Sequence, residues 1–234
     1  MKRIGNLMPK ILEVDNLLSA YYKAVKGKRC KKSVILFSSN LYENLLSLRD
    51  SIISGTFEVG HYHYFKIYDP KERLICAASF EERVLHHAVM NICHGYFERH
   101  LIFDTYATRK GKGIYSAIER ARKGMKTAGY VAKLDVRKYF DSISHNVLKK
   151  KLERLFKDNE LIGLLNQIID SYSVSEGRGI PIGNLTSQYF ANFYLSFLDH
   201  YAKEELKIPV YVRYMDDILV MGENKSVVKE YVAA

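Results

Sequence analysis

The chain has 234 residues, which is enough for one large domain or for two small domains that share a core. Its hydrophobic fraction of 47% argues against general disorder, and its three cysteines form no close-spaced pair, which argues against a disulfide framework and fits a reducing cytoplasm. A net charge of +10 suits nucleic acid, an acidic membrane surface or solubility alone, and does not choose among them. No apolar run approaches the length of a membrane span, and the basic start of the chain lacks the apolar segment of a signal peptide. The chain is therefore expected to be cytoplasmic, without membrane association.

The first half of the chain changes between helical and strand-like patterns. Helices are marked by apolar residues at helical spacing, and a β-hairpin is marked by aromatic and β-branched residues on either side of a turn sequence. Ser79 and Glu82 have the spacing of a capping box at the start of one helix. The predicted order is helix 9–26, basic connector 26–32, helix 40–54, hairpin 57–77 with its turn at 69–72, helix 79–97, basic loop 104–113 and helix 114–127.

The second half adds three strand patterns among further helices. Ser144 is expected to cap one helix, and Gly177 to Pro181 form a loop. The predicted order is strand 130–136, helices 144–156 and 159–173, loop 177–181, helix 184–206, strands 209–214 and 218–221, and a helix from 224 onward. Strands separated by pairs of helices fit an α+β fold, with a sheet that carries helices on one face.

Two adjacent acids lie between the last two strands. Tyr214, Met215, Asp216 and Asp217 occupy the tip of a predicted hairpin. Hairpin tips favour Asn-Gly or Asp-Gly because positive φ is needed there, so turn propensity alone does not explain this sequence. Neighbouring carboxylates repel unless cations neutralise them, and hard cations such as Mg²⁺ prefer oxygen ligands. Asp135 ends the other apolar strand, where it can complete a two-metal site for phosphoryl transfer.

The pair Asp216 and Asp217 also has a purely structural explanation, without a metal ion. A single Asp-Asp pair is more often a solvated turn than a metal site, and short motif matches give false positives. The strand context and the second strand-end acid, Asp135, favour the metal site.

Here the sequence resembles the reverse transcriptase family. The segments that carry the resemblance are Tyr214-Met215-Asp216-Asp217, Lys133 to Asp141 around Asp135, and Gly179 to Gln188 between them in the right order. The Ile-Gly-Asn and Ser-Gln version of the 179–188 segment is similar to that of diversity-generating retroelements, which are related to group II intron enzymes. Arg73, Glu82-Arg83 and Thr108 to Gly111 resemble finger motifs.

The resemblance implies a right-hand polymerase fold with three segments. These are an N-terminal helical extension (1–56), fingers (57–128) and a palm (129–234) that form one continuous unit. Members of the family continue into further palm strands and a helical thumb. Because this chain ends soon after the hairpin, the thumb is expected to be absent or incomplete and the sequence to be truncated.

By the same resemblance, Asp135, Asp216 and Asp217 are the catalytic metal ligands, with the carbonyl of Val136 as a further ligand. Two Mg²⁺ ions are implied, with Mn²⁺ as a substitute. Asp135 and Asp216 are expected to be the direct ligands, because adjacent residues on a strand point to opposite faces. The implied nucleotide-binding residues are Arg73, Phe140, Ile182 and Gly183, and the implied template and primer contacts are Arg109, Lys110, Gln188, Tyr214 and Met215.

Several of these roles have a structural alternative. Phe140 lies where the family has its gate against the ribose 2′-hydroxyl, but it is equally a core residue beside Tyr139. Arg73 suits a triphosphate through its guanidinium, and its alternative is a surface arginine of the hairpin. Ile182 replaces a polar residue, and an apolar contact cannot hold the nucleotide by hydrogen bonding. We expect this to loosen base selection.

The implied activity is RNA-directed DNA synthesis that is error-prone at adenines, in a diversity-generating retroelement. The implied partners are an RNA template, a DNA or RNA primer, deoxynucleoside triphosphates and a small basic accessory protein. One alternative is a group II intron-like or defence-associated reverse transcriptase. Another, from a different class, is a non-catalytic nucleic-acid-binding module derived from a polymerase, and the three aspartates argue against it.

Overall fold

The structure is a computed structural model that describes residues 3–68 and 71–234. The chain forms two compact units, and each unit draws on two separate stretches of sequence. Unit 1 comprises Met1–Gly95 and Ile143–Ser187, and unit 2 comprises Tyr96–Ser142 and Gln188–Ala234. The chain leaves unit 1 after Gly95, returns to it at Ile143 and leaves it again after Ser187.

Unit 1 is helical apart from one hairpin. Its elements are α1 (Met8–Ile11), α2 (Val14–Val25), α3 (Lys32–Ser39), α4 (Leu41–Ile53), strands β1 (Tyr62–Tyr68) and β2 (Glu72–Ala78), most of α5 (Phe80–His100), α8 (His145–Leu155), α9 (Asn159–Asp170) and the start of α10 (Leu185–Tyr194). The hairpin is antiparallel, with Tyr62 opposite Ala78 and Tyr68 opposite Glu72.

Most predicted elements of unit 1 are confirmed, with two differences. The predicted helix 9–26 is two helices, because Glu13 has an extended ψ of 134° that interrupts the helical backbone. Helix α3 was not predicted, and it begins at Lys32 inside the expected basic connector. Ser144 caps α8 as expected, since its Oγ accepts a hydrogen bond from the backbone N–H of Val147. Residues 69 and 70 of the predicted turn lie outside the described residues.

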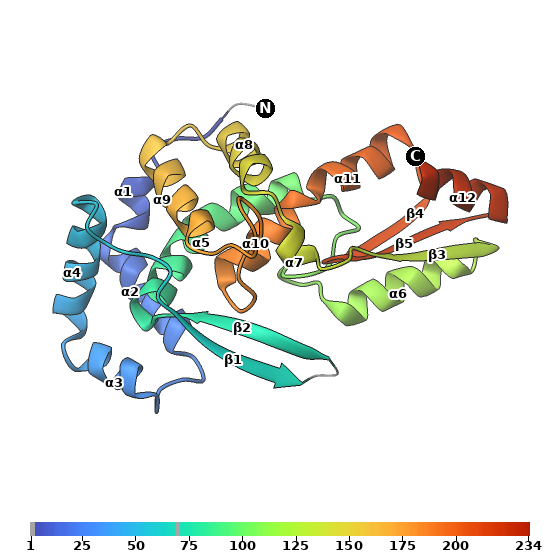
Figure 1. The fold of residues 1–234 in the computed structure, drawn as a ribbon. Helices are drawn as coiled ribbons and strands as arrows, with labels where there is room; N and C mark the ends of the chain where they lie inside the picture. The colour runs from blue at the N-terminus through green and yellow to red at the C-terminus, as the bar shows by residue number, and fades with distance from the viewer. Residues whose placement is uncertain (1–2, 69–70) are drawn as a thin grey trace. The chain divides into compact units, whose positions relative to one another are not determined.

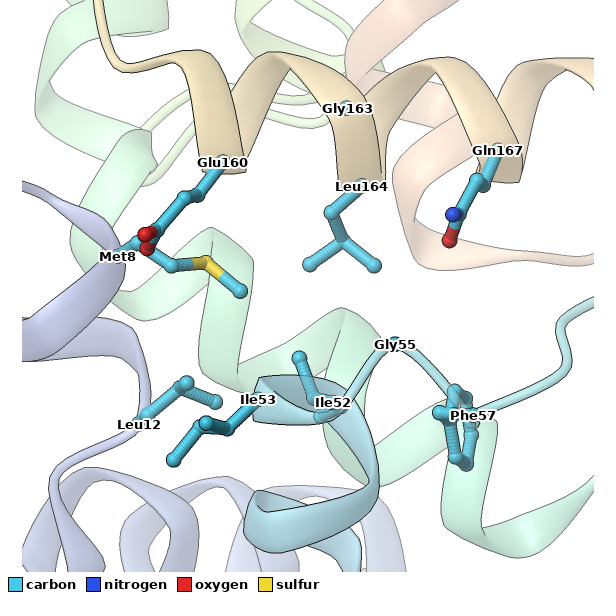
Figure 2. A pocket seen from close by; sticks show the side chains of 10 residues that line it. All are labelled: Met8, Leu12, Ile52, Ile53, Gly55, Phe57, Glu160, Gly163, Leu164 and Gln167. Atoms are coloured by element: carbon cyan, nitrogen blue, oxygen red, sulfur yellow. The ribbon is translucent and has the colours of Figure 1, made fainter.

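A pocket of about 260 Å³ lies between α1, the end of α4 and α9 in unit 1 (Figure 2). Met8, Leu12 and Leu164 line it with apolar surface, while Glu160 and Gln167 extend from α9. Its lining holds a single carboxylate and no basic side chain. The pocket is therefore an apolar groove between helices and does not have the composition of a phosphate or metal site.

Unit 2 is built around a three-stranded antiparallel sheet. Its elements are α6 (Ile114–Met125), β3 (Tyr130–Asp135), α7 (Tyr139–Ser142), the rest of α10, α11 (Ser196–His200), a π-helical segment (Tyr201–Glu205), β4 (Val210–Tyr214), β5 (Asp217–Gly222) and α12 (Lys225–Ala233). The strand order is β3-β5-β4, so the strand that follows the Asp-Asp pair lies in the centre.

Helices cover both faces of this sheet. On one face Val210 of β4 and Met221 of β5 pack against Ala121 of α6. On the other face Tyr211 and Val220 pack against Ala202 of the π-helical segment. Figure 1 shows α6 along one side of strands β3 to β5, and α11 and α12 along the other. The expectation of helices on one face was therefore wrong. Buried apolar side chains point to both faces of β4, with Val210 and Val212 on one face and Tyr211 on the other, so helices cover each face.

The predicted helix 184–206 is interrupted. Helix α10 ends at Tyr194, α11 covers Ser196–His200, and the chain then widens into the π-helical segment. Local π-helical turns are often found at functional positions. Asp199 lies on α11, between the two interruptions, and its buried carboxylate accepts hydrogen bonds from Arg213 of β4.

Candidate active site

The candidate site is built on the ends of β3 and β5 in unit 2. Asp135 is the last residue of β3 and Asp217 is the first residue of β5, and the two are direct partners in the ladder. Side chains of direct partners lie on the same face of an antiparallel sheet, with their Cβ atoms about 4.5–5.5 Å apart. The fold thus brings together two acids that are 82 positions apart in the sequence.

A lysine partly compensates this pair of acids. The Nζ of Lys133 lies 3.0 Å from Oδ1 of Asp217, and the two side chains are 68% and 49% exposed. This hydrogen bond, followed by the charge of Asp217 itself, raises the pKa of Lys133. Both acids and the lysine occupy one face of the sheet near its open edge, because Lys133 is two positions before Asp135 on β3.

Asp216 lies in the turn and not on a strand. Tyr214 of β4 pairs with Asp217 of β5, so Met215 and Asp216 form a two-residue loop. The premise that Asp216 and Asp217 are consecutive strand residues is thus not met, and it is Asp217 that faces Asp135. Asp216 is half-buried at the tip of the same hairpin, next to the pair.

The turn holds a strained residue. Met215 has a φ of 56°, whereas the φ of Asp216 is negative. A positive φ at the first loop residue alone is the pattern of a type II′ turn, which favours glycine at that position. A side chain in this region of φ costs about 1–3 kcal/mol and persists only when the surroundings fix it. Strain of this kind is common at functional sites.

Buried polar groups lie beneath the turn. Arg213, Asp199 and Asn192 are all buried, and the guanidinium of Arg213 forms an ion pair with Asp199 at 2.6 Å. Sequence reasoning missed these three residues. The available signal was Arg213 itself, a basic residue inside an otherwise apolar strand, since an arginine is rarely fully buried unless it is paired.

The donor set suits a hard divalent cation. Two carboxylates directly opposite each other on a sheet destabilise it unless a cation lies between or beside them. Across residues 3–68 and 71–234, no group of three or more His, Cys, Asp or Glu side chains is arranged to hold a metal ion. Mg²⁺ does not require such a cage, because it commonly binds through one or two carboxylates together with substrate phosphates. The pair Asp135 and Asp217, with Asp216 next to it, fits that mode.

Two other predicted residues lie close to β3 in the chain. Val136 follows the strand directly, so its carbonyl lies next to Asp135. Phe140 is on the short helix α7, where its ring makes an edge contact with Tyr139 at 5.8 Å between centroids. Tyr139 is buried and donates a hydrogen bond to the carbonyl of Ala191. Phe140 itself is half-buried.

The predicted nucleotide-binding residues of unit 1 gather at β2. Arg73 is on β2 and exposed. The carbonyl of Ile182 accepts a hydrogen bond from the N–H of Cys76 at 2.8 Å, so the 182–184 loop lies beside β2. Gly183 has a φ of 118°, and a Cβ there would lie 2.7 Å from Cγ2 of Ile75. Only glycine fits this close approach.

The predicted template contacts differ in how accessible they are. The side chain of Arg109 is only 7% exposed, and it donates to Glu98 and to the carbonyls of Ile102 and Thr105. Its donors therefore hold the loop together in this structure. Lys110 and Gln188 are exposed. Tyr214 and Met215 are half-buried in the hairpin.

The comparison with known families decides the affiliation of the chain. Residues 68–234 match the family described as "Reverse transcriptase (RNA-dependent DNA polymerase)". The chain belongs to the reverse transcriptase family. The match confirms the resemblance to the reverse transcriptase family. The matched residues include the segments that carry Asp135, Asp216 and Asp217.

Similar curated proteins cover most of the chain. The putative COX1/OXI3 intron 1 protein of Saccharomyces cerevisiae is 23% identical over an alignment of 218 positions, and the alignment covers 87% of this chain and 26% of the relative. Protein YkfC of Escherichia coli is 24% identical over an alignment of 187 positions, which covers 72% of this chain and 48% of the relative. The chain thus spans between about a quarter and a half of the length of these relatives.

Solved structures agree on the fold. A Candida albicans telomerase in complex with a TWJ fragment of telomeric RNA matches with a TM-score of 0.55 at 14% identity, over 82% of this chain and 43% of that one. A partial Cas6-RT-Cas1–Cas2 complex matches with a TM-score of 0.55 at 16% identity, over 93% and 38%. These matches confirm the predicted α+β polymerase fold. Among the described residues, no helix is both long and apolar enough to cross a membrane.

Proposed function

We propose that this protein copies an RNA template into DNA, adding deoxynucleotides to a DNA or RNA primer. The observation that carries the proposal is the placement of Asp135 opposite Asp217, with Asp216 in the adjoining turn. Membership in the reverse transcriptase family supports it. The basic net charge of +10 suits a protein that handles phosphate backbones.

Each acid would contribute in a different way. Asp135 and Asp217 provide carboxylate oxygens on one face of the sheet, and Asp216 and the carbonyl of Val136 can add further oxygens. Two Mg²⁺ ions, or Mn²⁺ in their place, would activate the primer hydroxyl and neutralise the leaving pyrophosphate. Lys133, which pairs with Asp217 at 3.0 Å, compensates the acids when no cation is bound. It would exchange this partner for solvent when a cation arrives.

Primer extension tests the proposal. The full-length protein is incubated with an RNA template, a DNA primer, deoxynucleoside triphosphates and either Mg²⁺ or Mn²⁺. We expect extension that requires the metal and is lost in Asp216→Asn. The matched control is Glu119→Gln, which also turns a carboxylate into an amide in unit 2, but on an exposed pair with Lys123. Absence of any metal-dependent extension by the wild type would favour the binding-module alternative.

We further propose that synthesis is error-prone at template adenines, as in a diversity-generating retroelement. The support is the sequence of the 179–188 segment, in which Ile182 offers an apolar side chain beside Gly183. In unit 1 the carbonyl of Ile182 is tied to β2, so its position is fixed by the hairpin. Ile182→Gln should lower misincorporation opposite adenine. An unchanged error rate would contradict this part of the proposal. A small basic accessory protein belongs to the same proposal.

A second candidate is an intron-encoded reverse transcriptase. It is favoured by the similar yeast proteins, two of which are named as COX1/OXI3 intron proteins. The genomic neighbourhood separates the two candidates. A template repeat paired with a variable repeat favours the retroelement, and a flanking intron RNA favours the other.

A further inference from the structure

In unit 2, the side chain of Arg213 has all five of its N–H donors paired although it is completely buried. Its Nε and Nη2 donate to the two carboxylate oxygens of Asp199, each at 2.6 Å. Nη2 also donates to the backbone carbonyl of Asn192 at 3.0 Å, and Nη1 to the side-chain oxygen of Asn192 at 3.0 Å. The fifth donor goes to the carbonyl of Met215 at 2.8 Å.

The partner carboxylate is held as firmly as the guanidinium. Asp199 is fully buried, and besides Arg213 it accepts hydrogen bonds from the hydroxyl of Tyr211 at 2.8 Å and from Oγ1 of Thr105 at 3.2 Å. A planar guanidinium that is bound in bidentate fashion to a fixed carboxylate cannot rotate. The direction of its remaining N–H groups is therefore set by the buried core of unit 2.

Through the Met215 carbonyl, the fixed guanidinium of Arg213 contacts the partly buried turn. Met215 is the residue with the positive φ of 56°, and it precedes Asp216 in the two-residue turn. Residues in such strained conformations persist when surrounding contacts determine them. The hydrogen bond from Nη1 of Arg213 to this carbonyl joins the turn to the core.

We propose that Arg213 is a positioning residue: its guanidinium anchors the Met215 carbonyl, and this anchor fixes the turn that carries Asp216 beside Asp135 and Asp217. The catalytic meaning of this anchor rests on the polymerase function proposed above. The anchor requires arginine and not positive charge alone. A lysine can pair with Asp199 through one ammonium group, but it cannot present a planar fork to Asp199, Asn192 and Met215 together.

Methyl NMR tests the anchor without relying on activity. The full-length protein is labelled with ¹³C-methyl methionine, and the Met215 signal is assigned through its loss in Met215→Leu. We expect Arg213→Lys to shift or broaden the Met215 signal. The matched control is Thr105→Val, which removes one hydrogen bond from Asp199 but leaves every donor of Arg213 paired. The control should leave the Met215 signal in place. An unmoved signal in Arg213→Lys overturns the proposal, and so does an equal shift in both variants.

Kinetics test the consequence for the acids. Arg213→Lys should lower kcat for primer extension by about 10–100-fold, as outer-shell supports of metal sites do, while KM for the deoxynucleotide stays within about threefold. Equal losses in Arg213→Lys and Thr105→Val would show a structural role only. If Arg213→Lys does not unfold cooperatively, the double variant Arg213→Met/Asp199→Leu takes its place, because it removes the hydrogen bond to Met215 without leaving a buried charge unpaired. An inactive wild type refutes the polymerase proposal, whereas the NMR comparison still decides whether Arg213 anchors the turn.

Discussion

Replacing Gly183 by alanine should destabilise unit 1 by about 2–3 kcal/mol, and the structure shows why. Gly183 has a φ of 118°, which is outside the range of L side chains, and its Cβ would lie 2.7 Å from Cγ2 of Ile75. Two effects therefore act together, namely an unfavourable backbone conformation and a steric overlap with β2.

The destabilisation caused by Gly183→Ala is limited because the loop can move away from β2. Overpacking costs about 1–3 kcal/mol, and an alanine at positive φ adds about 1 kcal/mol or more. The loop could avoid both by moving away from β2, but it would then lose the bond from Cys76 N to the Ile182 carbonyl and the bond from Ala78 N to Asn184 Oδ1. Overpacking and the backbone conformation together give about 2–4 kcal/mol, and losing two bonds at about 0.5–1.5 kcal/mol each limits the loss to about 3 kcal/mol, which leaves about 2–3 kcal/mol.

Urea denaturation followed by circular dichroism measures the loss, with a control in the same connecting segment. Gly177 has a φ of 64° and nothing within 4 Å of its Cβ position. Gly177→Ala therefore isolates the backbone contribution, expected at about 1 kcal/mol. Ile75→Ala in the Gly183→Ala background removes the overlap and should recover about 1 kcal/mol or more as coupling energy. If Gly183→Ala is no more costly than Gly177→Ala, the steric argument is refuted.

Three further predictions concern the rest of the molecule. Gly124→Ala places a Cβ against the side chain of Val210. It should lower the free energy of unfolding by about 1–3 kcal/mol, although alanine favours helices more than glycine does. A double-mutant cycle with Val210→Ala that shows no coupling would contradict this. Burial, followed by nearby positive charges, lowers the pKa of His87 from 6.5 to about 4. The unfolded state therefore binds a proton more readily than the folded state does. Stability should fall as the pH is lowered from about 6.5 to about 4. Urea midpoints at pH 7 and pH 5 should differ less in His87→Gln than in the wild type, and an equal difference would be the contrary result. Arg109→Ala leaves the Glu98 carboxylate and two partly buried carbonyls without their donor, and should cost about 2–3 kcal/mol. The neighbouring exposed Lys110→Ala should change stability by less than about 0.5 kcal/mol, and equal effects in thermal unfolding would show that Arg109 is not structural.

The strands around the acids could be predicted from sequence because their signals are local. Apolar runs on either side of Asp216 and Asp217 mark a hairpin, and a second apolar run ends at Asp135. The pairing of β3 with β5 places Asp135 opposite Asp217, and that register is a property of the sheet. No local pattern contains it, so only the family resemblance, and not the strand patterns alone, predicted that these two acids meet.

The supporting residues beneath the turn were not predictable in the same way. Asp199 and Arg213 are 14 positions apart and belong to different elements, the short helix α11 and strand β4, whereas the sequence pattern predicts one continuous helix from 184 to 206. Asn192 carries no signal of its own, since a single asparagine in a helix is ordinary. Tertiary packing decides all three positions.

Arg109 is a residue for which the sequence predicted contact with nucleic acid, whereas in the structure its donors bind groups of the protein itself. A loop rich in basic residues suggests contact with nucleic acid, and Lys110 is exposed as that interpretation requires. Arg109 instead donates to Glu98 and to two backbone carbonyls of its own unit. Composition predicts a basic loop, but it does not distinguish an arginine that faces solvent from one that satisfies buried acceptors.

The most direct test of the central claim is single-nucleotide incorporation on an RNA template by the full-length protein in Mg²⁺. The wild type is compared with Asp135→Asn and Asp217→Asn, and with Glu119→Gln as the charge-matched control. We predict that both aspartate variants lose at least about 100-fold in rate, while the control remains close to the wild type. Incorporation at the wild-type rate by either aspartate variant would contradict the assignment of this carboxylate pair as the catalytic centre.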